Sequence, residues 1–227
     1  METELGQRKH LFTNKQLWAL LVPVVVEQIL NSLMGTADTM MVSNVGSAAI
    51  SAVSLVDSIN VLVIQVFAAL AAGGTIICSQ YMGQKNVKNA TDAAKQLIFI
   101  ITAIAVVLTA VCVVFQIPLL HLIFGKVEEE VMTNSEVYFL YTALSFPFIA
   151  VFNAGSSVFR AQENTSLPMT ISVISNIMNI VGNAILIFGF HMGVAGAALS
   201  TLISRIFCAI VVMYFLRNPK EKICVRN

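Results

Sequence analysis

The sequence predicts an all-α integral membrane protein, folded as a bundle of six transmembrane helices. Of its 227 residues, 57% are hydrophobic and only 11% are charged, whereas about a quarter of an ordinary globular chain is charged. The charged residues also leave four long uncharged stretches, at 58–84, 96–125, 137–159 and 164–204. Each stretch is longer than the ~20 residues that a helix needs to cross a bilayer, so lipid must cover much of the surface.

The alternation of apolar runs and polar breaks places the six spans. They are expected at residues 17–42, 54–81, 95–118, 134–159, 167–189 and 194–216. The first span follows a polar segment, 1–16, and lacks the small-residue cleavage site of a signal peptide, so we expect it to stay in the protein. Pro23 should kink this span, because proline removes a backbone hydrogen bond.

Glycines and polar segments between the apolar runs define the boundaries of the later spans. In the second span, Gly73 and Gly74 allow close approach of another helix. A polar, acidic segment over 126–136 separates the third span from the fourth, and the fourth ends before Arg160. The uncharged run over 164–204 is too long for one crossing. The segment 189–193, Gly-Phe-His-Met-Gly, supplies the break that divides it into the fifth and sixth spans.

The basic residues predict the orientation of the bundle. Eleven of the 13 fall on one side, and Lys126 is alone on the other. The eleven are Arg8, Lys9, Lys15, Lys85, Lys88, Lys95, Arg160, Arg217, Lys220, Lys222 and Arg226. By the positive-inside rule, both termini are cytoplasmic. We therefore expect a multi-pass protein of the cell membrane, with a cytoplasmic segment at 1–16 and a basic cytoplasmic tail, or the start of an interlobe linker, at 217–227.

Composition and motifs exclude several classes of function. The formal net charge of +1 argues against a nucleic-acid-binding surface, which needs a basic excess. No P-loop, HExxH or GxSxG motif is present and the three histidines are isolated, so we predict no enzyme activity. The cysteines lack a CxxC spacing and are interpreted as small buried hydrophobes.

Three charged residues fall clearly inside spans. A charge in the bilayer costs several kcal/mol of free energy, so such residues are functional candidates. They are Glu27, Asp38 and Arg205; Asp57, at the predicted start of the second span, is expected to be interfacial. On the first span, Glu27, Asn31, Met34 and Asp38 have helical spacing and form one polar stripe. This stripe must face protein or water, because lipid cannot solvate it.

The fifth span has a second polar face, formed by Ser172, Asn176, Asn179 and Asn183. Two such faces in one bundle suggest a shared cavity. The topology and the helical rise of ~1.5 Å per residue place Asp38, Asn183, Ala197 and Thr201 in the outer half of the membrane. Their oxygen atoms suit a small cation or a proton. The alternative is an interhelical hydrogen-bond network that binds no ligand.

Glu27 and Arg205 both fall near mid-depth, where they could pair. Such a pair has two interpretations: a structural link between helices, or a role on a substrate path together with Asn31, Met34 and Asn176. Met34, with Met40 and Met41, could also line an adaptable apolar pocket.

Three segments resemble the multidrug and toxic compound extrusion (MATE) family. They are 33–42, LMGTADTMMV; 79–86, SQYMGQKN; and 193–201, GVAGAALST. The segment 160–164, RAQEN, resembles the family's intracellular turn after helix four, although Glu163 stands where glycine is common. The resemblance runs over residues 17–216.

The resemblance implies a twelve-helix antiporter with two six-helix lobes, of which this chain matches the N-terminal one. It identifies Asp38 as the cation- or proton-binding carboxylate, partnered by Asn179, Asn183, Thr201 and the carbonyl of Ala197. Some members have an acid where this chain has Asn183. The lost negative charge makes a tight sodium site doubtful and leaves at most a weak Na⁺ site at Asp38, Asn179, Asn183 and Thr201.

The expected function is secondary active multidrug export, in which organic cations or other amphipathic drugs are antiported against Na⁺ or H⁺ without a cofactor. The expected partners are the drug, the lipid bilayer and a missing C-terminal lobe or a second copy of the chain. Two alternatives are left open. One is a lipid or lipid-linked sugar flippase of the same superfamily, and the other is a truncated, non-transporting membrane fragment.

Overall fold

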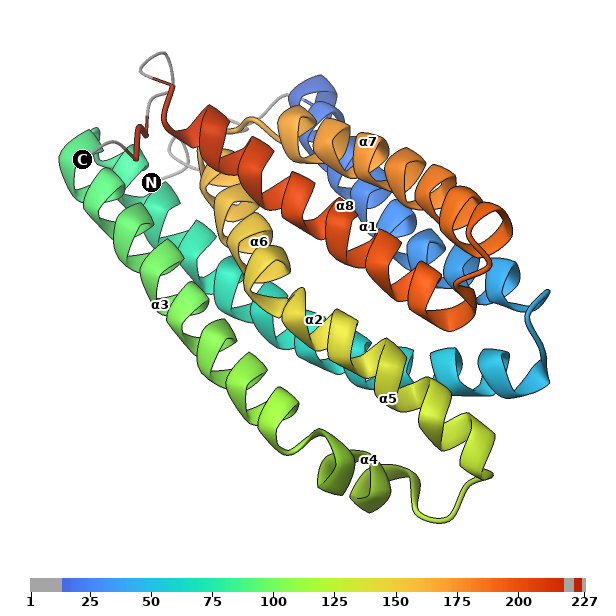
Figure 1. The fold of residues 1–227 in the computed structure, drawn as a ribbon. Helices are drawn as coiled ribbons and strands as arrows, with labels where there is room; N and C mark the ends of the chain where they lie inside the picture. Colours follow the sequence, from blue (N-terminus) through green and yellow to red (C-terminus); the bar gives the residue numbers. More distant parts are fainter. Residues whose placement is uncertain (1–13, 219–222, 226–227) are drawn as a thin grey trace, which may run out of the picture.

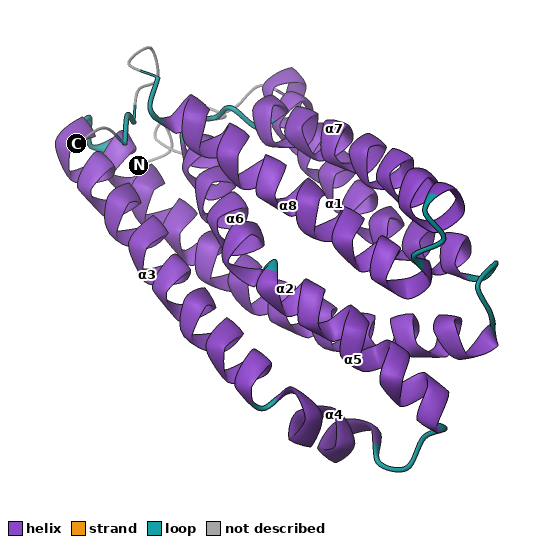
Figure 2. Cartoon of the chain, viewed as in Figure 1, coloured by secondary structure: helices purple, strands orange, loops and turns teal. Residues whose placement is uncertain are grey.

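The structure is a computed structural model that describes residues 14–218 and 223–225. All regular secondary structure in this part of the chain is helical (Figure 2). The elements are α1 (Asn14–Val42), α2 (Ser47–Gly83), α3 (Val87–Val114), α4 (Gln116–Phe124), α5 (Glu129–Leu144), α6 (Phe146–Ala161), α7 (Ser166–Asn183), the π-helix η1 (Ala184–Gly189) and α8 (Gly193–Leu216).

The helices pack in two groups (Figure 1). In the first, α1 lies against α7, and α7 lies against α8; in the second, α2 packs against α3, α5 and α6. Helix α8 joins the groups, because it also packs against α5 and α6. Many large apolar side chains are exposed, among them Phe99 and Leu122. Such a surface suits contact with lipid, while the polar side chains gather inside.

The prediction of an all-α membrane bundle is confirmed. Five helices are long and apolar enough to cross a bilayer, and α5 with α6 forms a sixth span if this bent pair is counted as one. The axis bends by 42° between them. The bend has a local cause: Pro147, in the first turn of α6, has no amide hydrogen to continue the ladder of α5. Ser145, at the break, donates its hydroxyl to the Thr142 carbonyl at 2.6 Å.

Several predicted boundaries differ from the structure. The third span, expected to run to 118, ends at Val114, and α4 begins at Gln116. Pro118 has no amide hydrogen to donate to the carbonyl of Val114, so the hydrogen-bond ladder of α3 does not continue, but proline is tolerated in the first turn of a new helix. The second span begins at Ser47 instead of 54, directly after Gly46, whose φ of 151° suits glycine. Helix α1 remains a single helix through Pro23.

The expected division of the long uncharged run is confirmed. Helix α7 continues into η1, which ends at Gly189, and α8 starts at Gly193. The reversal between them has positive φ angles at His191 and Gly193. π-Helical turns are rare overall, but those that occur are frequently found at functional sites. Here it directly follows Asn183, one of the predicted site residues.

Most of the basic residues within the described chain gather at one end of the bundle, with Lys126 at the other end and Arg205 inside α8. The start of α1, the turn from α2 to α3, the turn from α6 to α7 and the end of α8 all lie there (Figure 1). These segments carry Lys15, Lys85, Lys88, Arg160 and Arg217. The remaining predicted cytoplasmic residues in 1–13, 219–222 and 226–227 are outside the described residues, so the predicted terminal segments are described only in part.

Candidate functional site

Asp38 is the centre of a buried polar cluster. It lies on α1 and is 2% exposed. Asn183 at the end of α7 donates from Nδ2 to its Oδ1 at 2.6 Å, and Thr201 on α8 donates from Oγ1 to its Oδ2 at 2.8 Å. One carboxylate therefore holds three helices together. Hydrogen bonds from neutral donors lower the free-energy penalty of burying its charge.

The second layer of the cluster joins α7 to α8. Asn179 donates from Nδ2 to Thr201 Oγ1 at 3.1 Å, and Ser200 donates its hydroxyl to the Asn179 carbonyl at 2.8 Å. Both helices can approach this closely because position 182 is glycine; a Cβ there would collide with the side chain of Ser200. Ala197 is fully buried one turn before Thr201. The structure thus brings together four of the five residues to which the resemblance points, Asp38, Asn179, Asn183 and Thr201, while Ala197 lies one turn before Thr201 on α8.

Two ionisable residues of the cluster were missed or misplaced by the sequence. Tyr138 on α5 has its hydroxyl 3.3 Å from Asp38 Oδ2 and 3.1 Å from Asp57 Oδ1. Asn60 donates from Nδ2 to the same Asp57 oxygen at 3.2 Å. Asp57 was expected at the start of the second span, but α2 begins well before it, at Ser47, and the Asp57 carboxylate contacts Asn60 and Tyr138 within the bundle. Tyr138 gave no sequence signal, since its partners lie on other helices.

We call this set the Asp38 cluster. It comprises Asp38, Asp57, Asn60, Tyr138, Asn179, Asn183 and Thr201. Among the residues that the structure describes, no group of three or more His, Cys, Asp or Glu side chains could hold a metal ion. The oxygen atoms available to a monovalent cation are therefore carboxylate, amide and hydroxyl oxygens, as the sequence predicted.

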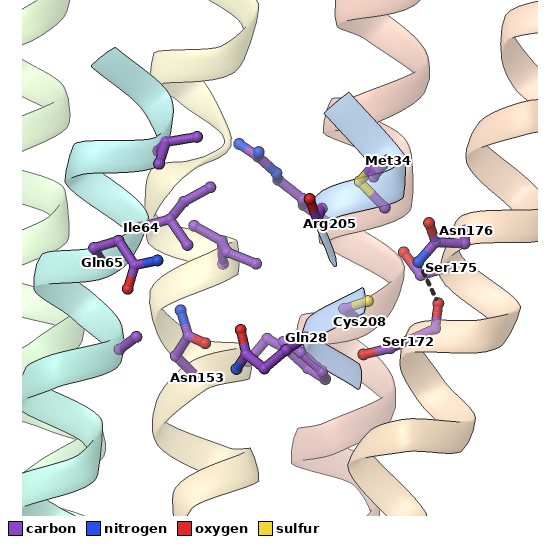
Figure 3. Close-up of a pocket in the computed structure, with 15 residues that line it drawn as sticks. Gln28, Met34, Ile64, Gln65, Asn153, Ser172, Ser175, Asn176, Arg205 and Cys208 are labelled. Carbon is purple, nitrogen blue, oxygen red and sulfur yellow. Dashed lines mark hydrogen bonds between the residues drawn. The ribbon is translucent and has the colours of Figure 1, made fainter. Parts of the chain in front are cut away.

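The bundle also contains a cavity of about 230 Å³ (Figure 3). Its lining comes from α1, α2, α6, α7 and α8. The lining residues are Gln28, Ser32, Met34, Val61, Ile64, Gln65, Ala68, Ile149, Phe152, Asn153, Ser172, Ser175, Asn176, Arg205 and Cys208. Pockets for drug-sized ligands usually enclose about 300–1,000 Å³, so this cavity by itself is smaller than such a pocket.

The cavity and the Asp38 cluster are one helical turn apart. Met34 precedes Asp38 by four residues on α1, and Arg205 follows Thr201 by four residues on α8. Residues with this spacing lie on the same face of a helix. The directions of the two helices place the cavity nearer the basic end of the bundle. An ion bound at Asp38 and a molecule in the cavity would therefore be close neighbours.

Arg205 is the charged residue of the cavity lining. It is 8% exposed, and its Nη1 donates to Ser145 Oγ at the α5–α6 break, at 2.6 Å. Its positive charge also attracts Asp38 and Asp57. Two further polar atoms of the lining, Asn153 Nδ2 and Ser172 Oγ, are buried without a hydrogen-bond partner. Buried polar groups of this kind are available to a ligand or to water.

The expected pair of Glu27 with Arg205 is not formed. Glu27 is buried and its Oε2 lies 2.7 Å from Nη2 of Arg160, in the last turn of α6. The long Arg160 side chain reaches α1 from the basic end, whereas Arg205 is engaged by Ser145. Glu27 therefore lies level with the end of α6 and outside the cavity lining. Met34 and Asn176 do line the cavity, and the Asn31 side chain lies outside the described residues.

A bundle of six spans, with a buried carboxylate cluster next to an internal cavity, defines a helical membrane transport protein. The comparisons with known proteins agree. The family model MatE matches residues 23–185. The chain belongs to the MatE family, whose members are transporters and not enzymes.

Individual relatives give the extent of the match. The chain is 32% identical over 209 residues to the "Uncharacterized transporter YisQ" of Bacillus subtilis, covering 90% of this chain and 45% of the relative. It is 29% identical over 214 residues to the "Probable multidrug resistance protein NorM" of Thermotoga maritima, covering 91% and 45%. The chain thus spans about half the length of these relatives.

A solved structure supports the fold. A MOP superfamily transporter from Pyrococcus furiosus superposes with a TM-score of 0.81 at 22% identity, covering 89% of this chain and 44% of that one. Its description states that reverse polarity of the binding pocket suggests a different function for that protein. At this identity the likeness establishes the fold alone.

Proposed function

We propose that this chain is one lobe of a secondary active multidrug exporter, which antiports organic cations or other amphipathic drugs against Na⁺ or H⁺. The observation that carries the proposal is the buried carboxylate of Asp38, one turn from a cavity lined by amide and apolar side chains. A network that only fastens helices needs no carboxylate in the membrane. The name of the Thermotoga maritima relative supports export of drugs.

The chemistry follows from the donors around Asp38. Asn183 and Thr201 compensate a negative carboxylate. When a proton or Na⁺ binds, the carboxylate is neutralised, and its hydrogen bonds from Asn183 and Thr201 become weaker. The contacts among α1, α7 and α8 then change in strength, which shifts the balance between two arrangements of the helices. A drug in the adjacent cavity would be released by this change.

Transport also needs a second helix bundle on the other side of the cavity. Alternating access is largely the rocking of one helix bundle against another around a fixed site. The partner bundle is a C-terminal lobe or a second copy of this chain, and the basic end of the lobe is cytoplasmic in the cell membrane. The cavity of about 230 Å³ is completed by that partner.

The test is gradient-driven efflux of a fluorescent organic cation from vesicles that contain the transporter. Asp38→Asn keeps the size of the side chain but removes its charge and replaces one of its two acceptor oxygens with an NH₂ donor, so efflux should fall to the level of empty vesicles. Asp92→Asn, an exposed carboxylate on α3, is the matched control and should leave efflux unchanged. Undiminished efflux by a normally expressed Asp38→Asn variant would contradict the proposal.

One observation favours a second candidate, a flippase for a lipid or lipid-linked sugar that carries an anionic group. The charged residue of the cavity lining is Arg205, and a guanidinium suits phosphate or carboxylate groups. If this candidate is correct, wild type should transport an anionic lipid and Arg205→Gln should abolish that transport, whereas wild type should show no gradient-driven efflux of a cationic dye.

A further inference from the structure

We propose that Asp57 is the second carboxylate of the coupling site, and that Asp57 and Asp38 share one proton through the hydroxyl of Tyr138. This inference rests on the proposed function, because it takes the Asp38 cluster to be the site that binds the coupling ion. It goes further by naming H⁺ as that ion. It also assigns Asp57, which the sequence places outside the site, to the proton-binding machinery.

The first argument is the hydrogen-bond capacity of Tyr138. Its hydroxyl oxygen lies 3.3 Å from Asp38 Oδ2 and 3.1 Å from Asp57 Oδ1. A phenol has one hydrogen to donate. If both carboxylates are ionised, only one of these two contacts can be a hydrogen bond. A proton on one carboxylate satisfies both, because that carboxyl donates to the phenol oxygen while the phenol donates to the other carboxylate.

The second argument is a surplus of acceptors at both ends of this chain. Asn183 donates to Asp38 and Asn60 donates to Asp57, so both amide groups lie against the carboxylates. The oxygen atoms of the two amides, Oδ1 in each case, are buried and have no partner. Both side chains are at least nine-tenths buried. Unpaired buried acceptors beside two carboxylates indicate a site that takes up a hydrogen-bond donor or a cation.

The third argument is charge. With asparagine at position 183, α7 contributes no carboxylate to the cluster, whereas α2 contributes Asp57. The titratable and charged groups that face Asp57 are Asp38 from α1, Tyr138 from α5 and Arg205 from α8. One cation against two carboxylates leaves one excess negative charge when both are ionised, and one added proton balances it.

Proton movement along this chain is balanced. The O–H bond of a protonated Asp57 breaks as its proton moves to the phenol oxygen, and the original phenol proton moves to Asp38. The result is a protonated Asp38, an ionised Asp57 and an unchanged neutral Tyr138. Asp38 belongs to the α1–α7–α8 group and Asp57 to the α2–α5–α6 group. The proton therefore passes from one group of packed helices to the other. Which carboxylate holds the proton can then depend on how closely the two groups pack.

The test is a pH titration of the purified protein in lipid nanodiscs, followed by the infrared C=O stretch of buried protonated carboxyl groups. Wild type should titrate in two steps, separated by more than about one pH unit because the groups interact. Asp57→Asn and Asp38→Asn should each leave one step. Tyr138→Phe should bring the two steps closer together. Asp57→Glu should restore two steps, and Asp92→Asn should match wild type.

Folding is checked separately by the thermal transition of each variant. The proposal is overturned if Asp57→Asn folds normally and leaves the Asp38 step at its wild-type pH. It is also overturned if replacing K⁺ by Na⁺ at constant pH removes the protonated carboxyl signal, because the site would then bind Na⁺. Neither result touches the exporter proposal, which fails only if Asp38→Asn leaves drug efflux intact.

Discussion

Each charge that the described chain keeps inside the bundle has a specific partner. Asp38 has Asn183 and Thr201, Asp57 has Asn60 and Tyr138, and Arg205 has Ser145. Glu27 has Arg160. A buried charge without such partners would be strongly destabilising. These contacts therefore act on stability as well as function, and the two effects need separate measurements.

Glu27 and Arg160 should be energetically coupled. We expect Glu27→Gln and Arg160→Gln each to destabilise the protein, since each leaves a charged or polar group poorly paired at the α1–α6 contact. The double mutant should be less destabilised than the sum of the single mutants, with a coupling of about 0.5–3 kcal/mol. Unfolding in mixed micelles measures all three variants.

The matched control uses the pair that the sequence predicted. A cycle of Glu27→Gln with Arg205→Gln should be additive, because the two side chains have different partners. Additive losses for Glu27 with Arg160, or a clear coupling for Glu27 with Arg205, would contradict the ion pair seen in the structure.

Close contacts between helices depend on small residues at defined positions. Gly155 on α6 faces α8, where an added Cβ would lie 2.6 Å from Val212 Cγ2 and 3.1 Å from its Cγ1. Gly74 on α2 similarly faces Leu97 on α3, whereas its neighbour Gly73 has nothing within 4 Å of an added Cβ. The prediction of close helix approach at the glycine pair therefore applies to Gly74 alone.

Gly155→Ala should destabilise the bundle by about 1–3 kcal/mol through overpacking against α8. Gly73→Ala is the control at another position inside a helix. It should be neutral or stabilising by up to about 1 kcal/mol, since alanine favours helix more than glycine does. Thermal unfolding in detergent separates the two. Equal effects of both substitutions would show that contact with Val212 does not limit this position.

At the scale of the whole molecule, two surfaces are distinct: one end of the bundle is basic, and the outer surface has many exposed apolar residues. The chain covers about half of the relatives' length, and the proposed partner lobe would cover part of this surface. The positive-inside rule predicts that the basic end faces the cytoplasm.

The orientation is testable with single cysteines in a background in which the four native cysteines are replaced. Asn44, between α1 and α2, and Gln84, between α2 and α3, are both exposed and lie at opposite ends of the bundle. In intact cells, a membrane-impermeant maleimide should label Asn44→Cys but reach Gln84→Cys only after permeabilisation. The reverse pattern would place the basic end outside and contradict the proposed topology.

The sequence by itself determined the class of fold and the division of the longest uncharged run, and it predicted a common depth for Asp38, Asn183, Ala197 and Thr201. These properties follow from hydropathy and helical periodicity, which are local along the chain. The tertiary structure decided which charges meet. The pairing of Glu27 with Arg160, and the position of Tyr138 between Asp38 and Asp57, depend on how each helix is rotated and packed, and contacts between distant helices fix that rotation.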